Sequence, residues 1–231
     1  MWQENYSMSP TMTARDFMYK VYGWMSGALA VTAGIAYYIG TTPAIYTELF
    51  KSPMLFYGIM IAQVVLVIFF IWKMKSLTYS QAVVAFMAYA MMVGVTTSSI
   101  FMVYTMSSIY MAFVVAAGMF AATALYGYLT SADLTSMGSF LTMGLFGLMI
   151  AMLVNMWFRS PLADYYISLA AVGIFTLLTA YDVQNIKRIG ESHMIDGDTK
   201  QKLAVYGAFT LYLDFINMFL NLLNLLGKKR D

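Results

Sequence analysis

The most constraining feature of the sequence is a run of 57 residues, from Ser76 to Ala132, that contains no Asp, Glu, Lys or Arg. A water-soluble domain could not cover its surface with so few polar groups. Over the whole chain of 231 residues, 61% are hydrophobic and only 10% are charged, whereas roughly a quarter of the residues are charged in an average soluble domain. The chain is therefore predicted to lie almost entirely within a lipid bilayer.

Uncharged runs mark the predicted membrane spans, because a helix needs about 20 apolar residues to cross the hydrocarbon core. The 57-residue run suits a helical hairpin that turns near Thr105, Ser107 and Ser108. Ser160 and Pro161 are typical of a helix start, with serine as N-cap and proline in the first turn. The predicted fold is an all-α polytopic membrane protein with seven transmembrane helices at approximately 18–40, 54–72, 82–104, 108–130, 137–158, 165–186 and 203–226.

These spans form one membrane domain, residues 18–227, which follows a soluble N-terminal arm of residues 1–17 and precedes a basic tail of residues 228–231. Before the last span, residues 198–201 (Asp-Thr-Lys-Gln) resemble a capping box and predict where that helix begins. The first 17 residues include acidic side chains and precede an apolar run that is too long for a signal peptide. We therefore expect the arm to be retained.

The distribution of Lys and Arg predicts a cytoplasmic amino terminus. With that orientation the inner segments hold eight basic residues: Arg15, Lys20, Lys73, Lys75, Lys187, Arg188, Lys200 and Lys202. The outer loops hold only Lys51 and Arg159. A full seventh crossing would place the basic tail outside and make the ratio eight to five, whereas a re-entrant last segment would make it eleven to two. The length of the last segment favours the crossing, and the absence of large loops suggests a bacterial inner membrane.

Composition excludes several classes of site and partner. The chain has no cysteine, so disulfides and thiolate chemistry are excluded. Its single histidine, His193, lies in a polar stretch, so no histidine-based metal site or Ser-His pair is predicted inside the membrane. The net charge of +2 is too small to indicate a nucleic-acid partner.

Asp182 and Asp214 are the two acidic residues that stand inside otherwise uncharged spans. A charged carboxylate at the centre of a membrane helix costs about 2.5–3.5 kcal/mol on insertion scales, so something must compensate each of them. Asp182 precedes Lys187 by little more than one helical turn and is expected near the inner surface. Asp214 is expected deeper, on the neighbouring span, so the two carboxylates could meet.

A polar stripe follows the same last span. Thr210, Asp214, Asn217, Asn221 and Asn224 are spaced four, three, four and three residues apart, which places them on one face of a helix. Such a stripe would be very costly against lipid, so it must face other helices or water. Two interpretations stay open: hydrogen bonding between helices, or a helix that lines a permeation path with Asp214 on it.

These residues carry a resemblance to a known family. Ala180-Tyr-Asp-Val-Gln-Asn-Ile-Lys187 and Leu211-Tyr-Leu-Asp-Phe-Ile-Asn-Met-Phe-Leu-Asn-Leu-Leu223 resemble the last two spans of the transmembrane Bax inhibitor motif family, bacterial type. The third-span segment of residues 88–101 is similar to that family's Gly-x-Thr span. The resemblance implies a central last helix wrapped by six others, and a pH-sensitive calcium leak governed by two aspartates that match Asp182 and Asp214.

A proton-sharing pair agrees with this implied activity. Two adjacent carboxylates cannot both ionise easily, so we expect Asp182 and Asp214 to hold a proton between them and to act as a pH sensor and gate. Oxygen groups are also the ligands that calcium prefers, so the pair could bind the permeant ion transiently, with no resident cofactor. Family members carry a basic residue that contacts the aspartates, which implies Lys73 or Lys75 here, although simple flanking of the membrane surface is an alternative for both.

Other function classes fit the sequence less well than a channel. An intramembrane aspartyl protease would also use two aspartates, but it has Gly-x-Gly-Asp where this chain has bulky residues before Asp214, so an enzyme is not expected. A retinal protein needs a lysine in the last span, which has none. A non-transporting regulator that binds a membrane protease or another membrane protein stays an alternative. The expected partners are the bilayer, calcium ions and protons.

Overall fold

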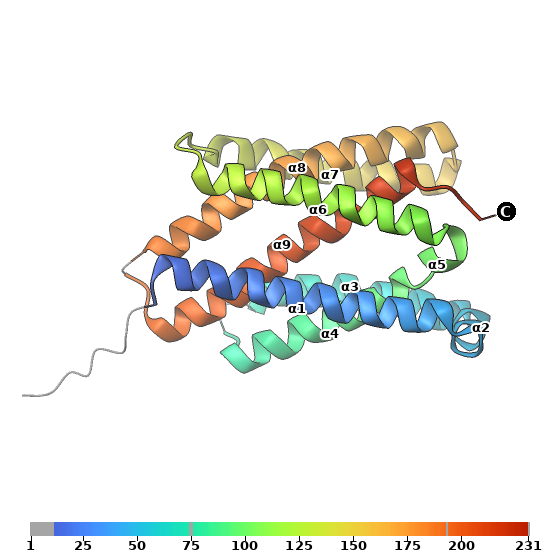
Figure 1. Cartoon of the computed structure of the whole chain (residues 1–231), viewed down its shortest axis with the longest axis horizontal. Helices are drawn as coiled ribbons and strands as arrows, with labels where there is room; N and C mark the ends of the chain where they lie inside the picture. Colours follow the sequence, from blue (N-terminus) through green and yellow to red (C-terminus); the bar gives the residue numbers. More distant parts are fainter. Residues whose placement is uncertain (1–11, 74–75, 193, 231) are drawn as a thin grey trace, which may run out of the picture.

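The computed structural model describes residues 12–73, 76–192 and 194–230 (Figure 1). The helices within these ranges are α1 (Ala14–Thr41), α2 (Pro43–Lys51), α3 (Pro53–Lys73), α4 (Tyr79–Thr97), α5 (Ile100–Val103), α6 (Met106–Leu129), α7 (Thr135–Phe158), α8 (Pro161–Glu191) and α9 (Gly197–Leu226). Outside these helices, the described backbone forms an isolated antiparallel β-bridge between Tyr104 and Lys229. The predicted all-α class is confirmed.

Polar side chains fix where several helices begin. Ser160 caps α8 by accepting a hydrogen bond from the backbone N–H of Ala163 at 3.3 Å, as predicted. For α9 the expected capping box at residues 198–201 is wrong, because Asp196 is the N-cap and accepts from the Thr199 N–H at 2.6 Å. The helix therefore begins at Gly197, one turn and more before the predicted span at 203, since the aspartate competes successfully for the free N–H groups of the first turn.

Six helices of the described chain are long and apolar enough to cross a membrane: α3, α4 with α5 (Tyr79–Val103), α6, α7, α8 and α9. Helices α1 and α2 would make a seventh span if they act as one unit, although they are bent by 92° relative to each other. The sequence did not predict α2, because Glu48 and Lys51 interrupt the apolar pattern there. The result is a multi-pass helical membrane protein.

Helix α9 is the most buried of these spans. In its most apolar stretch 67% of the residues are buried, compared with 6% in α3. Helices α1, α4, α6 and α8 pack directly against it. The main contacts of α3 are with α4 and those of α7 are with α8, although Phe70 of α3 reaches α9 and lies 4.4 Å from Phe209, ring centre to ring centre. Four of the six predicted neighbours thus contact α9 closely along its backbone.

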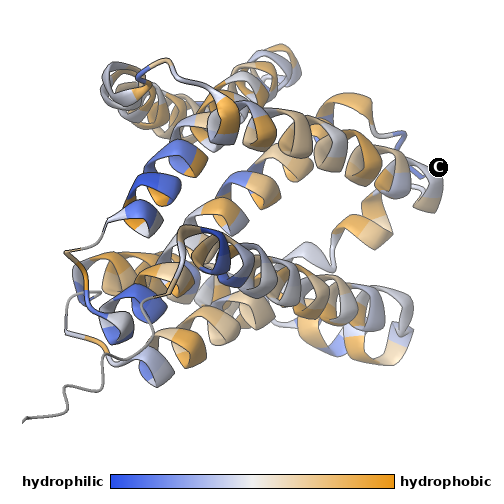
Figure 2. Cartoon of the chain, turned by 60° about the vertical axis from the view of Figure 1, so that its left-hand side comes forward, coloured by the Kyte–Doolittle hydropathy of each residue, from blue (hydrophilic) through white to orange (hydrophobic). Residues whose placement is uncertain are grey.

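The connections lie at two ends of the bundle (Figure 1). The start of α1 and the α3–α4, α6–α7 and α8–α9 connections lie at one end, here called the amino-terminal end, and α2, α5, the α7–α8 turn and the tail lie at the other, the carboxyl-terminal end. Because α9 runs without a break between the two, the structure favours a full crossing over a re-entrant segment. Figure 2 shows hydrophilic residues gathered where α1 and α9 begin and where α8 ends.

Candidate functional site

The two membrane aspartates lie on the two helices that share the most extensive interface. Asp182 is in the second half of α8 and Asp214 is near the middle of α9. Close approach is possible because Gly207 of α9 faces Ile186 of α8, where an added Cβ would lie 3.2 Å from the isoleucine side chain. The small residue lets the two backbones pack tightly beside the aspartates.

The carboxyl groups of Asp182 and Asp214 are hydrogen bonded to each other. Asp214 is only 4% exposed, and its buried Oδ2 atom has no further hydrogen-bond partner among the described residues. Ionised carboxylates have no hydrogen to donate, so a bond between two such groups requires that one of them carries a proton. The sequence prediction that these residues meet is therefore realised as a direct contact.

A buried hydrogen-bond chain fixes the rotation of α9 around Asp214. The hydroxyl of Tyr212, which is fully buried, lies 2.7 Å from the Thr32 hydroxyl of α1. Thr32 in turn donates to the Ala90 carbonyl of α4 at 2.9 Å. Because a buried tyrosine hydroxyl needs a partner, turning α9 away from α8 would break this chain. The chain holds Asp214 toward Asp182.

The α6–α7 loop holds the end of α8 that carries Asp182. The Gln184 amide donates to the Ala132 carbonyl at 2.7 Å and accepts from the Leu134 N–H at 3.0 Å. One turn later, Arg188 forms an ion pair with Asp133 at 2.7 Å. These contacts join residues about 50 positions apart and were not predicted.

Neither predicted basic partner is found beside the aspartates. Lys73 lies exposed in the last turn of α3 and forms no ion pair with Asp182 or Asp214 in the described structure. Lys75, the other candidate, lies outside the described residues, as does His193. Lys187, although it is close in sequence, donates to the Tyr128 carbonyl at 2.9 Å.

Lys200 is a buried cation that the sequence interpretation placed among the solvated loop charges. It is 4% exposed and donates from Nζ to the Gly190 carbonyl at 3.1 Å and to the Met12 carbonyl at 3.4 Å. Its ammonium group thereby joins the end of α8, the start of α9 and the residues before α1. No sequence signal distinguishes it from the neighbouring loop lysines.

Most of the polar stripe on α9 bonds to its own helix. Thr210, Asn217 and Asn221 are half-buried and donate to backbone carbonyls one turn earlier, at 3.2, 2.8 and 2.8 Å. Asn224, in contrast, bonds to another helix: its amide donates to Asp164 and to Ser168 of α8, both at 2.8 Å. Interhelical bonding therefore accounts for two of the five members of the stripe, Asp214 and Asn224.

The stripe ends at a polar cavity of about 360 Å³ at the carboxyl-terminal end. Helices α7, α8 and α9 form it, with the lining residues Met152, Asn155, Met156, Asp164, Ile167, Ser168, Leu220, Asn221 and Asn224. It contains one carboxylate and three amides. Asp164 was not predicted as a site residue, because a carboxylate in the first turn of a helix is an ordinary feature.

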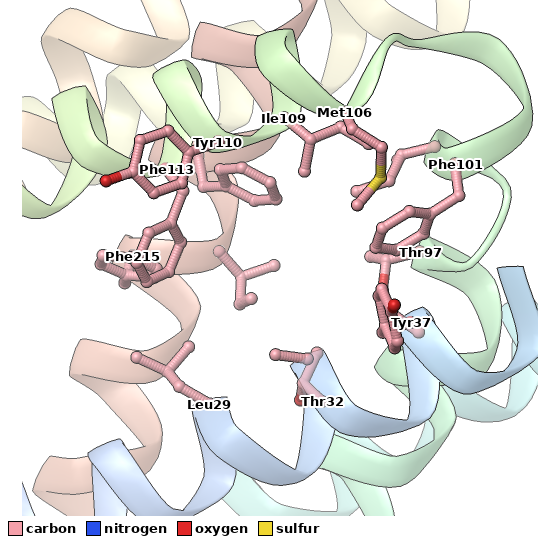
Figure 3. Close-up of a pocket in the computed structure, with 15 residues that line it drawn as sticks. Leu29, Thr32, Tyr37, Thr97, Phe101, Met106, Ile109, Tyr110, Phe113 and Phe215 are labelled. Atoms are coloured by element: carbon pink, nitrogen blue, oxygen red, sulfur yellow. The ribbon is translucent and has the colours of Figure 1, made fainter. Parts of the chain in front are cut away.

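A second, apolar cavity of about 340 Å³ lies between α1, α6 and α9 (Figure 3). It is lined by Leu29, Thr32, Ala33, Ala36, Tyr37, Thr97, Ile100, Phe101, Met106, Ile109, Tyr110, Phe113, Phe215, Ile216 and Phe219. The described residues contain no group of three or more His, Cys, Asp or Glu side chains that could hold a metal ion. Any cation at the aspartates would therefore be bound by the pair together with amide or carbonyl oxygens.

Comparisons with known proteins agree with this architecture. The family model described as "Inhibitor of apoptosis-promoting Bax1" (Bax1-I) matches residues 14–231. The inner membrane protein YbhL of Escherichia coli (strain K12) is 41% identical over 224 residues, which cover 96% of each chain. A protein of Borreliella burgdorferi is 43% identical over 215 residues, 93% of each chain, and RP147 of Rickettsia prowazekii is 39% identical over 221 residues. The chain belongs to the Bax inhibitor family.

Proposed function

We propose that the protein is a pH-sensitive calcium leak channel of the bacterial inner membrane, in which Asp182 and Asp214 form the gate. The observation that carries this proposal is the carboxyl–carboxyl hydrogen bond at the interface of α8 with α9, the most buried span. A contact that needs a proton is a natural sensor of pH, because losing that proton leaves two negative charges in one place.

The polar stripe supports a path that leads to this gate. From the cavity at the carboxyl-terminal end, Asn224, Asn221 and Asn217 follow one another up α9 at intervals of about one helical turn, and Asp214 is next. The amide groups of Asn217 and Asn221 donate to backbone carbonyls, which leaves their side-chain oxygens for an ion. Such oxygens suit a hard cation such as calcium, which takes six to eight oxygen ligands.

The gate works through the protonation state of the pair. With one shared proton, the hydrogen bond holds α8 and α9 together and the path is closed beyond Asp214. When the proton is lost, the two carboxylates repel each other and together attract a divalent cation. Opening is then favoured as the pH rises, and calcium replaces the proton as the group that balances the charge.

The distribution of basic residues supports the orientation of this path. The amino-terminal end of the bundle carries seven of the twelve Lys and Arg residues that the structure describes and would face the cytoplasm. Asp182 and Gln184 lie toward that end, so the gate would control the cytoplasmic half of the path. The carboxyl-terminal cavity, with Asp164, would be its outer entrance.

A flux assay on the full chain in liposomes tests the proposal. Calcium uptake into proteoliposomes loaded with an indicator is measured between about pH 6 and pH 8, for the wild type and for Asp182→Asn and Asp214→Asn. We expect wild-type uptake to rise with pH and both variants to lose that dependence, whereas Asp198→Asn, at an exposed aspartate of the same end, keeps it. If the variants of the pair show the wild-type pH profile, the shared proton does not control the gate. If the wild type takes up no calcium, the protein is not a calcium channel.

A further inference from the structure

The apolar cavity between α1, α6 and α9 opens sideways, out of the helical bundle. In Figure 3, Leu29 of α1, Phe113 of α6 and Phe215 of α9 project into it. At its rim, Tyr110 is 71% exposed and Tyr37 is 54% exposed. Since these residues belong to helices that cross or approach the membrane, the opening faces lipid tails rather than water.

The contents of such a cavity must be apolar. The two threonines that line it already have partners: Thr32 bonds to the Tyr212 hydroxyl and to the Ala90 carbonyl, and Thr97 donates to the Val93 carbonyl at 2.7 Å. Water needs two to four polar partners to occupy a cavity, and an apolar cavity stays dry or takes an apolar ligand. In a bilayer the apolar molecule present at the highest concentration is the acyl chain of a phospholipid.

The basic tail lies at the outer end of the same cavity. Arg230 donates from its guanidinium to the carbonyl of Phe101, a residue that lines the cavity, at 3.3 Å. Its backbone N–H donates to the Val103 carbonyl at 2.9 Å, and the Lys228 carbonyl accepts from the Thr105 N–H at 3.1 Å. The backbone bonds hold the tail in place while the side chains of Lys228, Lys229 and Arg230 are exposed.

We propose that an anionic phospholipid binds here, with one acyl chain in the apolar cavity and its phosphate against Lys228, Lys229 and Arg230. Charge complementarity selects an anionic headgroup, since each Lys or Arg near a membrane surface contributes attraction to acidic lipids. The site also gives a role to the three cations of the tail, which lie at the end opposite to the predicted cytoplasmic side, where most Lys and Arg residues are expected. It does not depend on ion transport.

The lipid would contact the helix that carries Asp214. Phe215, Ile216 and Phe219, which line the cavity, follow that aspartate within about one and a half turns of α9. An acyl chain in the cavity would fill the space on this side of α9 and support its packing against α8. The ligand is therefore expected to stabilise the fold as well as to bind.

Native mass spectrometry of the full chain tests the headgroup part. The protein is released from detergent in the presence of equal amounts of phosphatidylglycerol and phosphatidylcholine with identical acyl chains. We expect preferential retention of phosphatidylglycerol. The combined variant Lys228→Gln, Lys229→Gln and Arg230→Gln should reduce the preference about tenfold or more, since each cation contributes roughly a fivefold factor. The matched control is Lys51→Gln with Arg159→Gln, two exposed cations of the same end, which should keep the preference.

A pair of substitutions on α1 tests the acyl part. Ala33 lines the cavity, whereas an added Cβ at the neighbouring Gly34 meets nothing within 4 Å. Ala33→Phe should lower the retention of both lipids, and Gly34→Phe should leave it unchanged. Equal retention of the two lipids by the wild type, or a preference that survives the combined tail variant, would overturn the headgroup site. Unchanged lipid retention in Ala33→Phe would contradict the placement of the acyl chain in this cavity.

Discussion

The carboxyl group of Asp182 on α8 is hydrogen bonded to that of Asp214 on α9, and the buried Oδ2 atom of Asp214 has no further hydrogen-bond partner among the described residues. If the contact served only to hold the helices together, an Asn–Asp pair would be more stable than two aspartates, because the asparagine amide supplies an N–H donor at every pH. A bond that depends on a proton therefore favours an interface that exists in two states.

Asn and Ala at position 214 are expected to have opposite effects. Asp214→Asn places an N–H donor opposite Asp182, so the two helices stay bonded at every pH and calcium uptake stays low. Asp214→Ala leaves Asp182 without its partner, so uptake is high and independent of pH. The two variants should differ by about tenfold, which corresponds to a hydrogen bond to a charged group of roughly 1.5 kcal/mol. Equal uptake by the two variants in proteoliposomes would contradict the proposal that the bond between these side chains keeps the path closed.

The ion pair between Asp133 and Arg188 should make stability depend on acid pH. The Thr135 hydroxyl, followed by the Arg188 guanidinium, holds the pKa of the Asp133 carboxyl below its ordinary value of 3.8. A carboxyl whose pKa is lower in the folded state stabilises the fold above the unfolded value, and this contribution is lost as the pH falls through the folded value. The melting temperature of the wild type in detergent should therefore fall below about pH 4.

Substitutions of either partner check this dependence. Asp133→Asn should flatten the acid side of the melting curve plotted against pH, and Arg188→Gln should flatten it in part, because the Thr135 contact persists. An Asp133→Asn protein that loses stability with acid as steeply as the wild type would show that other carboxyl groups are responsible. Both residues are exposed, so neither change is expected to prevent folding.

The parts of the molecule that could be predicted are those that leave a mark along one chain. Asp182 and Asp214 interrupt uncharged runs, and a charge in such a run is anomalous wherever the helices pack. The stripe on α9 follows from helical periodicity alone. The family and the all-α class could therefore be predicted with the aspartate pair, before any contact was known.

The parts that could not be predicted depend on tertiary contacts or on ordinary local sequence. Gln184 meets the α6–α7 loop only because α6, α7 and α8 pack together. Asp164 lies in the first turn of α8, where carboxylates are common, so the sequence contained nothing to single it out. Lys73 shows the converse: its position at a span end fits the implied partner, yet the side chain is exposed.

Two glycines of α6 should respond oppositely to alanine. A Cβ at Gly127 would overlap the backbone carbonyl of Ala180, whereas a Cβ at Gly118 meets nothing within 4 Å. Gly127→Ala must push α6 away from α8 and should destabilise the protein by about 1–3 kcal/mol. Gly118→Ala should be neutral or stabilising by up to about 1 kcal/mol, since alanine favours helix. Thermal unfolding in detergent measures both, and equal melting temperatures would contradict the close α6–α8 contact.

Gln184 is expected to stabilise the end of α8. Gln184→Ala removes two hydrogen bonds and leaves the buried Leu134 N–H without its partner, which should lower stability by about 1–3 kcal/mol. Asn185→Ala, at the exposed next position, is the matched control and should change the melting temperature little. Because Gln184 lies two residues from Asp182, loss of its bonds to the α6–α7 loop should also shift the pH dependence of calcium uptake. If it changes neither property more than the control does, the α6–α7 loop does not position the gate.

Asn221 discriminates between the two interpretations of the polar stripe. Its amide donates to the Asn217 carbonyl of its own helix and its side chain lines the polar cavity, so it holds no other helix in place. Asn221→Leu has a similar volume and removes the polar group. If α9 lines a permeation path, the variant should lower calcium uptake about tenfold at the higher pH while it keeps the wild-type pH profile and melting temperature, since a cation loses one oxygen ligand on its way to Asp214. If the stripe only joins helices, uptake should be unchanged, whereas Asn224→Leu should lower the melting temperature because its bonds to Asp164 and Ser168 are lost. Calcium uptake and thermal unfolding, measured on both variants, therefore distinguish a permeation path from hydrogen bonding that only joins the helices.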